Sequence, residues 1–245
     1  MSQFIYGLHA IKALLNAQAE SIERLLFINT GLNPAIQALQ ELAKQNRVAI
    51  DLLSKSQFDD LLGKEAVHQG VVAQCKNVTG FNEEVLEDLL DDLKKPPFLL
   101  LLDGVQDPHN LGAILRSANA FGVHAVIAPK DRAVGLTPVV HKVACGAASL
   151  TPFIQVTNLS RTMEMLKKRG IWLTGLDEHT EFSLSKIDLK GAVGLVLGNE
   201  GQGLRELTKK NCDHIAKIAL PGAIKSLNVS VAAGCALFEV NRQRS

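Results

Sequence analysis

Residues 99–118 read LLLLDGVQDPHNLGAILRSA, and this order of apolar run, turn and helix decides the fold class. The same order recurs in residues 193–207 (VGLVLGNEGQGLREL) and 218–239 (IALPGAIKSLNVSVAAGCALFE). In each, an apolar run typical of a buried strand leads through a turn rich in Gly, Pro or Asn into a helix. Open α/β sheets bind ligands at the C-terminal ends of parallel strands, so the three segments predict one ligand site there.

The rest of the C-terminal region extends the alternation of strands and helices. Further apolar runs and amphipathic stretches predict a six-stranded, mostly parallel sheet with helices on both faces, an α/β fold. The expected strands are 98–102, 125–127, 150–156, 171–174, 194–197 and 217–220, and the expected helices 110–121, 139–144, 158–168, 204–211 and 228–243.

The N-terminal region predicts a second, smaller α/β domain over residues 1–75. Its expected helices are 6–16, 34–45 and 56–62, and its expected strands 25–29, 48–52 and 70–75. Residues 76–97 (KNVTGFNEEVLEDLLDDLKKPP) are acidic with apolar residues at helical spacing, and the Pro-Pro pair ends the helix. We therefore expect a domain at 1–75, a helical linker at 76–97 and a second domain at 98–245.

Composition sets limits on the class of protein. The 245 residues carry a net charge of +1 and four cysteines without metal-like spacing. The N-terminus lacks the pattern of a signal peptide, and no apolar run is long enough to span a bilayer. The expectation is a cytoplasmic protein with reduced thiols, without a metal and without a membrane segment.

Charge is unevenly distributed along the chain. Residues 1–75 hold 6 Lys and Arg against 7 Asp and Glu, and residues 76–97 hold 3 against 6. Residues 98–245 hold 17 against 12, a net charge of +5. A modestly basic C-terminal region is compatible with binding an RNA backbone but does not require it.

The turn Gly198-Asn199-Glu200-Gly201-Gln202-Gly203 is the first candidate for a binding loop. Its glycine spacing differs from the dinucleotide fingerprint, which argues against an ordinary NAD enzyme. Three glycines around one acid indicate a tight turn whose backbone amides approach a ligand. A side chain at Gly198 or Gly201 is expected to clash with that ligand or to oppose a positive φ.

Three further polar residues are candidates, each with a plain structural alternative. Asn110 and Asn228 stand where helices are expected to begin, so capping alone explains both. Arg116 lies on the helix that follows Asn110, where it either acts in the site or pairs with a surface carboxylate. His109, in the same turn, is a weaker candidate, because a single His in such a turn is more often a local hydrogen-bonding residue.

Together the three segments resemble the SpoU family of RNA 2′-O-ribose methyltransferases, within the SPOUT superfamily. The family's first motif matches Asn110–Ala113 through Arg116, and its second matches Gly198–Gly203. Its third matches Leu220–Gly222 followed by Ser226–Ala232. The resemblance extends to YGLHAIKALL and HQGVVA near the N-terminus and to the terminal FEVNRQR, so it covers nearly the full chain.

The resemblance implies a trefoil knot in the C-terminal domain, a homodimer with sites near its interface, and a small N-terminal RNA-binding domain. It is strongest to bacterial members that methylate a guanosine ribose in large-subunit (23S) ribosomal RNA. It also implies S-adenosylmethionine as cofactor, held in the knot. The cofactor residues carried over are Leu197, Gly198, Asn199, Gly201, Ile218, Leu220, Ser226 and Leu227.

The catalytic residues that the resemblance implies are Arg116, Glu200, Asn228 and Asn110. Arginine stays protonated, so Arg116 is expected to clamp the phosphate beside the target ribose rather than act as a base. Glu200 either holds Arg116 in a bidentate pair or receives the hydroxyl proton, and Asn228 orients the ribose or caps its helix. Two alternatives stay open: 2′-O-methylation of a transfer RNA, and a non-catalytic RNA-binding factor in ribosome assembly.

Overall fold

The computed structural model describes residues 3–6, 8–29, 33–62, 69–76, 81–224 and 226–245. The chain divides into two compact units, Met1–Leu89 and Leu90–Ser245. The division falls inside helix α4 (Glu83–Asp92), the helix expected within 76–97. Its apolar residues Val85, Leu86, Leu89 and Leu90 are buried, which is why this acidic stretch is helical.

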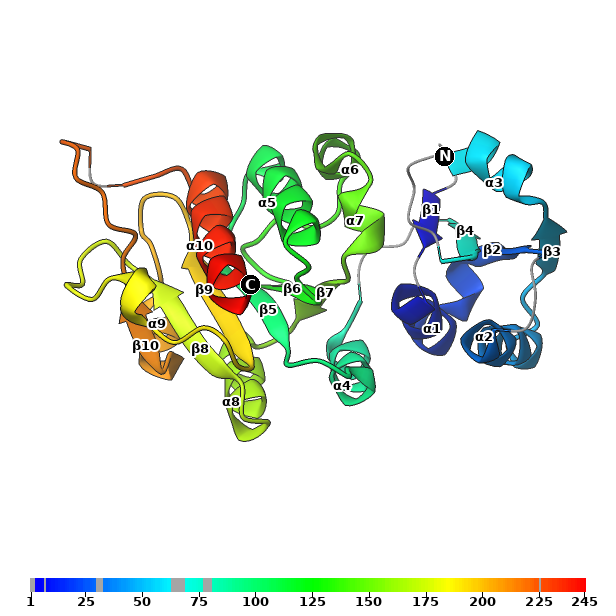
Figure 1. Cartoon of the computed structure of the whole chain (residues 1–245), viewed down its shortest axis with the longest axis horizontal. Coiled ribbons are helices and arrows are strands. Elements are labelled where there is room, and N and C mark those ends of the chain that lie inside the picture. The colour runs from blue at the N-terminus through cyan, green and yellow to red at the C-terminus, as the bar shows by residue number, and fades with distance from the viewer. Residues whose placement is uncertain (1–2, 7, 30–32, 63–68, 77–80, 225) are drawn as a thin grey trace. The chain divides into compact units, whose positions relative to one another are not determined.

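The N-terminal unit is a four-stranded mixed sheet with helices on both faces (Figure 1). Its strands are β1 (Gln3–Tyr6), β2 (Ile22–Ile28), β3 (Ile50–Leu53) and β4 (Val71–Cys75), in the order β1-β4-β2-β3. Strands β2 and β3 are parallel, and β4 is antiparallel to both β1 and β2. Helices α1 (Leu8–Ala17) and α2 (Pro34–Gln45) lie on one face, and α3 (Lys55–Leu62) on the other.

Two sequence expectations for this unit need correction. Strand β1 is absent from the expected elements, and Tyr6, expected in the first helix, belongs to this strand instead. Four residues at a sheet edge carry too short an alternation to be recognised. Strand β2 begins at Ile22, three residues earlier than expected.

The C-terminal unit is a six-stranded parallel sheet with helices on both faces, which confirms the expected α/β class. Its order is β10-β8-β9-β5-β6-β7, and every neighbouring pair is parallel. The strands are β5 (Phe98–Asp103), β6 (Ala125–Pro129), β7 (Phe153–Val156), β8 (Trp172–Leu176), β9 (Val193–Gly198) and β10 (His214–Ala216). Every residue of β5 and β6 is buried, as expected for strands covered on both faces.

One face of this sheet carries helices that pack on one another: α5 (Pro108–Ala120), α6 (Pro138–Ala144), α7 (Ala147–Leu150) and α10 (Val229–Arg244). Figure 1 shows α8 (Leu159–Lys168) on the opposite side from α5 and α10, and α8 contacts α9 (Glu206–Asn211). The main core is formed by β5, β6 and β9 against α5 and α10. Two short 3₁₀ turns, Ala19–Ser21 and Leu184–Lys186, complete the elements.

The strand order places a site between β5 and β9. From β5 the chain proceeds through β6 to β7 on one side, whereas from β9 it passes beyond β8 to β10 on the other. The two connections leave in opposite directions, so a crevice opens at the C-terminal ends of β5 and β9. The pairing runs from Phe98↔Val193 to Asp103↔Gly198, so Asp103 and Gly198 lie side by side there.

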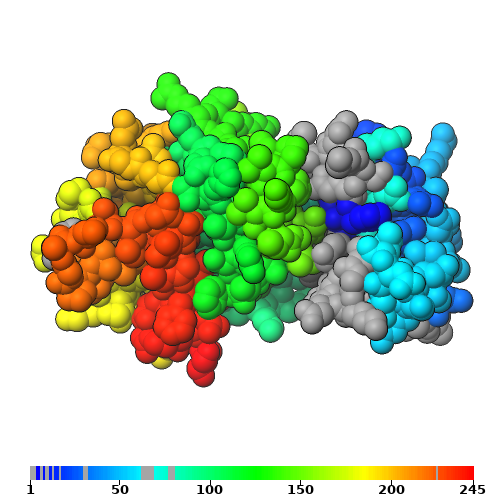
Figure 2. Space-filling view, turned by 90° about the horizontal axis from the view of Figure 1, so that it is seen from above, coloured from blue at the N-terminus to red at the C-terminus, as the bar shows by residue number. Residues whose placement is uncertain are grey.

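Several expected boundaries in this unit are wrong. The last strand is His214–Ala216 rather than 217–220, so Ile218 and Leu220 follow it in the coil before α10. Figure 2 shows this part of the chain on the surface beside α10. Residues 147–150 are helical, so β7 begins only at Phe153. The threading of the chain into a knot stays a prediction.

Candidate active site

The loop after β9 is a tight turn closed by its own backbone. Asn199 and Gly203 exchange two backbone hydrogen bonds of 3.2 Å, and the Asn199 side chain accepts one from the Gln202 N–H at 3.1 Å. Gly201 has φ +105° and Gly203 has φ +65°, conformations that favour glycine. This confirms the positive φ expected at Gly201.

Gly198 is required for a different reason. A Cβ at this position would lie 2.0 Å from the carbonyl carbon of Gly203, because the loop returns directly over it. Residue 198 has no positive φ. The positive φ expected at Gly198 is therefore wrong, and the clash with a ligand stays a prediction. The structure adds another reason for glycine, because the loop backbone itself excludes a side chain.

Asp103 anchors the far end of this loop. Its carboxylate is only 1% exposed, accepts a hydrogen bond from the Arg205 N–H at 3.0 Å, and lies 3.4 Å from the Arg205 guanidinium. The loop is thus tied to the end of β5 as well as to β9. Asp103 is not among the site residues predicted from sequence, although a carboxylate at the end of an apolar strand is a signal that could have identified it.

Three polar side chains from distant segments form one hydrogen-bonded chain. Asn228 donates from Nδ2 to the Asn110 Oδ1 at 3.1 Å, and Asn110 donates from Nδ2 to the Glu200 carboxylate. Asn110 lies in the first turn of α5 and is 8% exposed, Glu200 lies in the β9 loop, and Asn228 precedes α10. The three segments recognised in the sequence therefore meet at this point.

The direction of this chain is set by the start of α10. The Asn228 Oδ1 accepts from the Ser230 N–H at 2.9 Å and from the Ser230 hydroxyl at 2.6 Å. A backbone N–H only donates, so the Asn228 oxygen must face it and its amino group must face Asn110. Asn228 is thus both the N-cap of α10, as expected, and a member of the site.

Asn110 is not a helix cap, which corrects that expectation. The N-cap of α5 is Asp107, whose carboxylate accepts from the His109 N–H at 2.9 Å, with Pro108 at the first helical position. That hydrogen bond from the His109 backbone is the largest effect that lowers the pKa of the exposed Asp107 carboxylate. Because Asp107 caps the helix, the amide of Asn110 is available to the Glu200 carboxylate.

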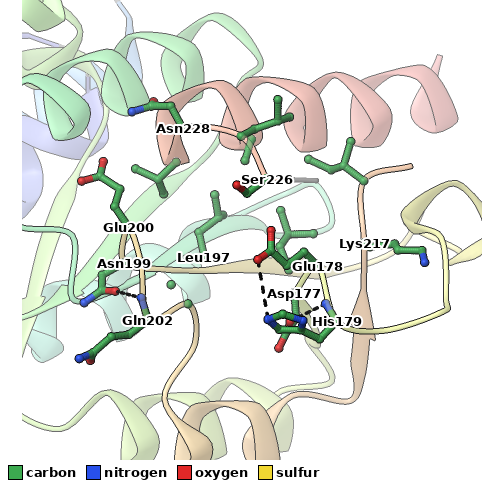
Figure 3. Close-up of a pocket in the computed structure, with 18 of the residues that line it drawn as sticks. Asp177, Glu178, His179, Leu197, Asn199, Glu200, Gln202, Lys217, Ser226 and Asn228 are labelled. Atoms are coloured by element: carbon green, nitrogen blue, oxygen red, sulfur yellow. Dashed lines mark hydrogen bonds and ion pairs between the residues drawn. The ribbon is translucent and has the colours of Figure 1, made fainter. Parts of the chain in front are cut away.

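A pocket of about 540 Å³ opens beside this chain of polar groups (Figure 3). Its walls come from the end of β8, the β9 loop and the segment between β10 and α10. The apolar lining comes from Leu197, Ile218, Leu220 and Leu227. Figure 3 shows Glu200 and Asn228 at one end of the pocket. All eight residues expected to hold a cofactor line it: Leu197, Gly198, Asn199, Gly201, Ile218, Leu220, Ser226 and Leu227.

The other end of the pocket is charged, and its residues are not among those predicted from sequence. Lys209 lies 2.5 Å from Asp177, and Lys217 lies 3.1 Å from Glu181. Burial raises the pKa of Asp177, but hydrogen bonds from Lys209 and the His179 N–H outweigh it and hold the pKa below its usual range. Asp177 follows β8, so the rule about C-terminal strand ends would have identified it.

Arg116 lies apart from this pocket. It is six residues beyond Asn110 on α5, about 9 Å along the axis and on another side of the helix. Its side chain is exposed, and Nη1 lies 3.7 Å from the Sγ of Cys145, which follows α6. The Arg116–Glu200 pair considered from sequence is not formed, since Glu200 accepts from Asn110 instead.

Metal-binding clusters and membrane-spanning helices are both absent from the residues that the structure describes. No group of three or more His, Cys, Asp or Glu side chains in this part of the chain is arranged to hold a metal ion. No helix within the same residues is long and apolar enough to cross a membrane.

The fold and the three converging segments define the class of this protein. The family model "SpoU rRNA Methylase family" matches residues 97–238, and "RNA 2'-O ribose methyltransferase substrate binding" matches residues 4–80. The chain belongs to the SpoU methylase family.

Particular relatives narrow the comparison. The chain is 53% identical over 240 residues to the 23S rRNA (guanosine-2′-O-)-methyltransferase RlmB of Coxiella burnetii, covering 98% of this chain and 95% of that protein. It is 45% identical to RlmB of Escherichia coli strain K12, over 100% of both chains. Among solved structures, it resembles the SpoU methyltransferase AviRb from Streptomyces viridochromogenes in complex with AdoMet. That match has 25% identity and a TM-score of 0.64, and covers 99% of this chain and 90% of that one.

Proposed function

We propose that this protein methylates the ribose 2′-hydroxyl of a guanosine in 23S ribosomal RNA, with S-adenosylmethionine as methyl donor. The observation that carries the proposal is the convergence of Asn110, Glu200 and Asn228 at one end of a pocket built by the second and third motifs. The full-length identity to RlmB proteins supports the substrate and the position of the reaction in the cytoplasm, where ribosomal RNA is found.

The pocket fits the proposed cofactor. Its apolar lining at Leu197, Ile218 and Leu220 suits an adenine ring and an aliphatic chain. When bound, S-adenosylmethionine supplies a methyl group activated by a neighbouring sulfonium cation. Asn199, Gly201, Ser226 and Leu227 would hold it, with Gly198 shaping the loop from beneath.

Glu200 is the group that we place beside the ribose hydroxyl. Among the described residues only Asn110 hydrogen-bonds to its carboxylate, through Oε1, so Oε2 remains available to accept a hydrogen bond from the hydroxyl. Asn110 and Asn228 hold the carboxylate in one orientation, which favours in-line positioning of the weakly nucleophilic oxygen. Proton transfer to Glu200 or to the neighbouring phosphate completes the step.

The protein acts as a homodimer in this proposal. Val231, Cys235 and Phe238 fall on one side of α10, at positions i, i+4 and i+7. Val231 is 51% exposed and Phe238 is 56% exposed, although they form an apolar stripe. In the proposal a second copy of the chain covers this stripe and supplies its own Arg116 to the pocket, because the Arg116 of the same chain lies apart from it. There the guanidinium would clamp the phosphate next to the target ribose.

The two units divide the work. Residues 98–245 bind the cofactor and carry out the transfer, and residues 1–75 bind RNA. A transfer RNA substrate is the alternative on the same fold, and a non-catalytic assembly factor would not need the intact set of Arg116, Glu200 and Asn228.

Ribose-methylation mapping tests the proposal directly. Ribosomal and transfer RNA are compared from cells with and without the gene, and from the deletion strain complemented with Glu200→Ala. We expect one 23S guanosine to lose its 2′-O-methyl group in the deletion and in the complemented variant. If a methyl group is lost from transfer RNA instead, the substrate is a transfer RNA and not 23S rRNA. If no methyl group is lost from either RNA, the proposed methyltransferase activity is contradicted.

A further inference from the structure

Among the residues that the structure describes, helix α3 covers only part of one face of the N-terminal sheet (Figure 1). The fully buried Phe58 of this helix packs with Leu26 and Val72. Beyond these contacts, Phe4 on β1, Gln74 on β4 and Arg24 on β2 lie in register across three strands. This row forms the floor of a recess beside α3.

The recess is a cavity of about 250 Å³ with two kinds of lining. The apolar residues are Phe4, Leu26, Leu53 and Leu61, and the polar residues are Arg24, Asp51, Gln57 and Gln74. The two kinds are mixed across one opening, which suits a ligand with an apolar face and a hydrogen-bonding edge.

The polar residues are held in place yet keep free hydrogen-bonding atoms. Arg24 donates from Nε to the Gln74 Oε1 at 2.8 Å and from Nη1 to the Asp51 Oδ2 at 3.2 Å. Gln57 accepts at Oε1 from the Ser54 N–H at 2.8 Å. Among the described residues, the Arg24 Nη2, the Asp51 Oδ1 and the Gln57 Nε2 have no partner, so two donors and one acceptor converge.

Charge argues against a phosphate in this recess. Arg24 is already paired with Asp51, and residues 1–75 as a whole have a net charge of −1, from 6 basic and 7 acidic residues. Yet this is the region that matches the substrate-binding family model. RNA recognition that does not depend on bulk charge uses unpaired bases, which pack on aromatic or apolar side chains and are hydrogen-bonded along their edges.

We propose that this cavity binds a single unpaired base of the RNA substrate. The ring packs against Phe4 and the neighbouring leucines, while its edge donates to Asp51 and accepts from Arg24 and Gln57. The proposal rests on the proposed function, because it assigns the RNA-recognition contacts of the same enzyme to particular residues.

Asp51→Asn in the full-length protein tests this, because charge and base recognition predict opposite signs. If the N-terminal unit interacts with RNA only through the charge of the phosphates, removing a carboxylate strengthens RNA binding. If Asp51 accepts a hydrogen bond from a base edge, the change weakens it. Glu41→Gln is the matched control, since it removes the same charge from an exposed ion pair with Lys44 on α2, which lies on the other face.

The measurements use protein-free 23S rRNA from a strain that lacks the gene. For Asp51→Asn we expect the KM for RNA to rise about fivefold or more. The kcat at saturating RNA and the Kd for S-adenosylmethionine should stay at wild-type values. Phe4→Leu should raise the KM in the same way through lost stacking, and Glu41→Gln should not raise it. Thermal melts confirm that each variant is folded.

Unchanged or tighter RNA binding by both Asp51→Asn and Phe4→Leu would overturn the proposal. A change in kcat for these variants without a change in their KM for RNA would overturn it as well. If the wild-type protein bound RNA but transferred no methyl group, the proposed function would fail, whereas the comparison of RNA affinities would still decide the cavity.

Discussion

The Asn110 amide donates a hydrogen bond to the Glu200 carboxylate, although 90 positions separate the two residues in sequence. The bond joins the first turn of α5 to the β9 loop, across the point where the connections from β5 and β9 diverge. Asn228 completes the arrangement from the start of α10. The orientation of Glu200 therefore depends on a chain of hydrogen bonds that begins at the Ser230 N–H.

Asn228→Ser should separate the two roles of Asn228. Serine keeps a side-chain oxygen for capping α10 but has no amide to donate to Asn110. We expect the melting temperature to stay close to wild type and methyl transfer to fall about tenfold or more, the loss of one hydrogen-bonded link to a charged group. Asn228→Ala should lose the same activity and about 1 kcal/mol of stability as well. Equal activity of Asn228→Ser and wild type would make Asn228 a cap alone.

Gly198→Ala should damage the cofactor pocket even though alanine is small. Its Cβ would lie 2.0 Å from the Gly203 carbonyl carbon, so the loop must open. Calorimetry should show S-adenosylmethionine binding weakened at least tenfold. Gly191→Ala is the control, because a Cβ there meets nothing within 4 Å and its φ is not positive. Wild-type affinity in Gly198→Ala would mean that the loop conformation does not form the pocket.

The fold class followed from sequence because buried parallel strands leave a strong signal. LLLLD at β5 and VGLVLG at β9 are continuous apolar runs, and both strands are buried over nearly their whole length. The short strands β1 and β10 could not be predicted in this way. β1 has four residues and β10 has three, and such lengths carry almost no periodicity.

The cofactor pocket could be predicted in part from sequence, because many of its residues belong to recognisable motifs. Residues of the second and third motifs were expected to line a cofactor pocket, and they line one pocket in the structure. The position of Arg116 could not be read in this way, because it depends on which side of α5 faces α10. The cap of α5 was also misassigned, since both Asp107 and Asn110 are good capping residues and only geometry distinguishes them.

The four cysteines should differ in reactivity toward a thiol reagent. Burial raises the pKa of Cys75 to about 12, and burial likewise raises the pKa of Cys212 to about 12, so both hold little thiolate near neutral pH. Cys145 and Cys235 are exposed. Cys235 belongs to the stripe that the second copy is proposed to cover, whereas Cys145 lies outside it. Labelling of the native protein at pH 8, followed by peptide mapping, should therefore modify Cys145 first, and Cys235 only when the dimer dissociates. Rapid modification of Cys75 or Cys212 would contradict the burial seen here.

Modification of Cys145 should also impair methyl transfer, because its Sγ lies 3.7 Å from the Arg116 guanidinium. In a Cys235→Ser background, alkylation with N-ethylmaleimide should lower activity in step with labelling of Cys145. The double variant Cys145→Ser/Cys235→Ser should keep activity after the same treatment. Full activity at complete labelling of Cys145 would show that the function of Arg116 does not depend on its contact with Cys145.

Phe238→Asp should convert the proposed dimer into monomers. Phe238 is 56% exposed on the apolar stripe of α10, and a carboxylate buried against a second copy would be strongly unfavourable. Light scattering after size-exclusion chromatography should report the mass of one chain, 26.4 kDa. Leu207→Asp is the control, since Leu207 is 60% exposed on α9, outside that stripe. A dimeric Phe238→Asp protein would move the interface elsewhere.

Mixed dimers should show that Arg116 acts on the pocket of the opposite chain. Within one chain the side chains of Arg116 and Glu200 do not meet. Glu200 lies on the side of α5 that carries Asn110, whereas Arg116 points from another side toward Cys145. Arg116→Ala and Glu200→Ala should each abolish methyl transfer as pure homodimers. When the two are unfolded and refolded together in equal amounts, half of the dimers contain one of each. Every mixed dimer then holds one site with both residues intact, so the mixture should recover about a quarter of wild-type activity.

If Arg116 instead served the pocket of its own chain, every site in the mixture would lack one residue. The mixture would then stay inactive, and Arg116 would have to reach Glu200 by a rearrangement within the chain.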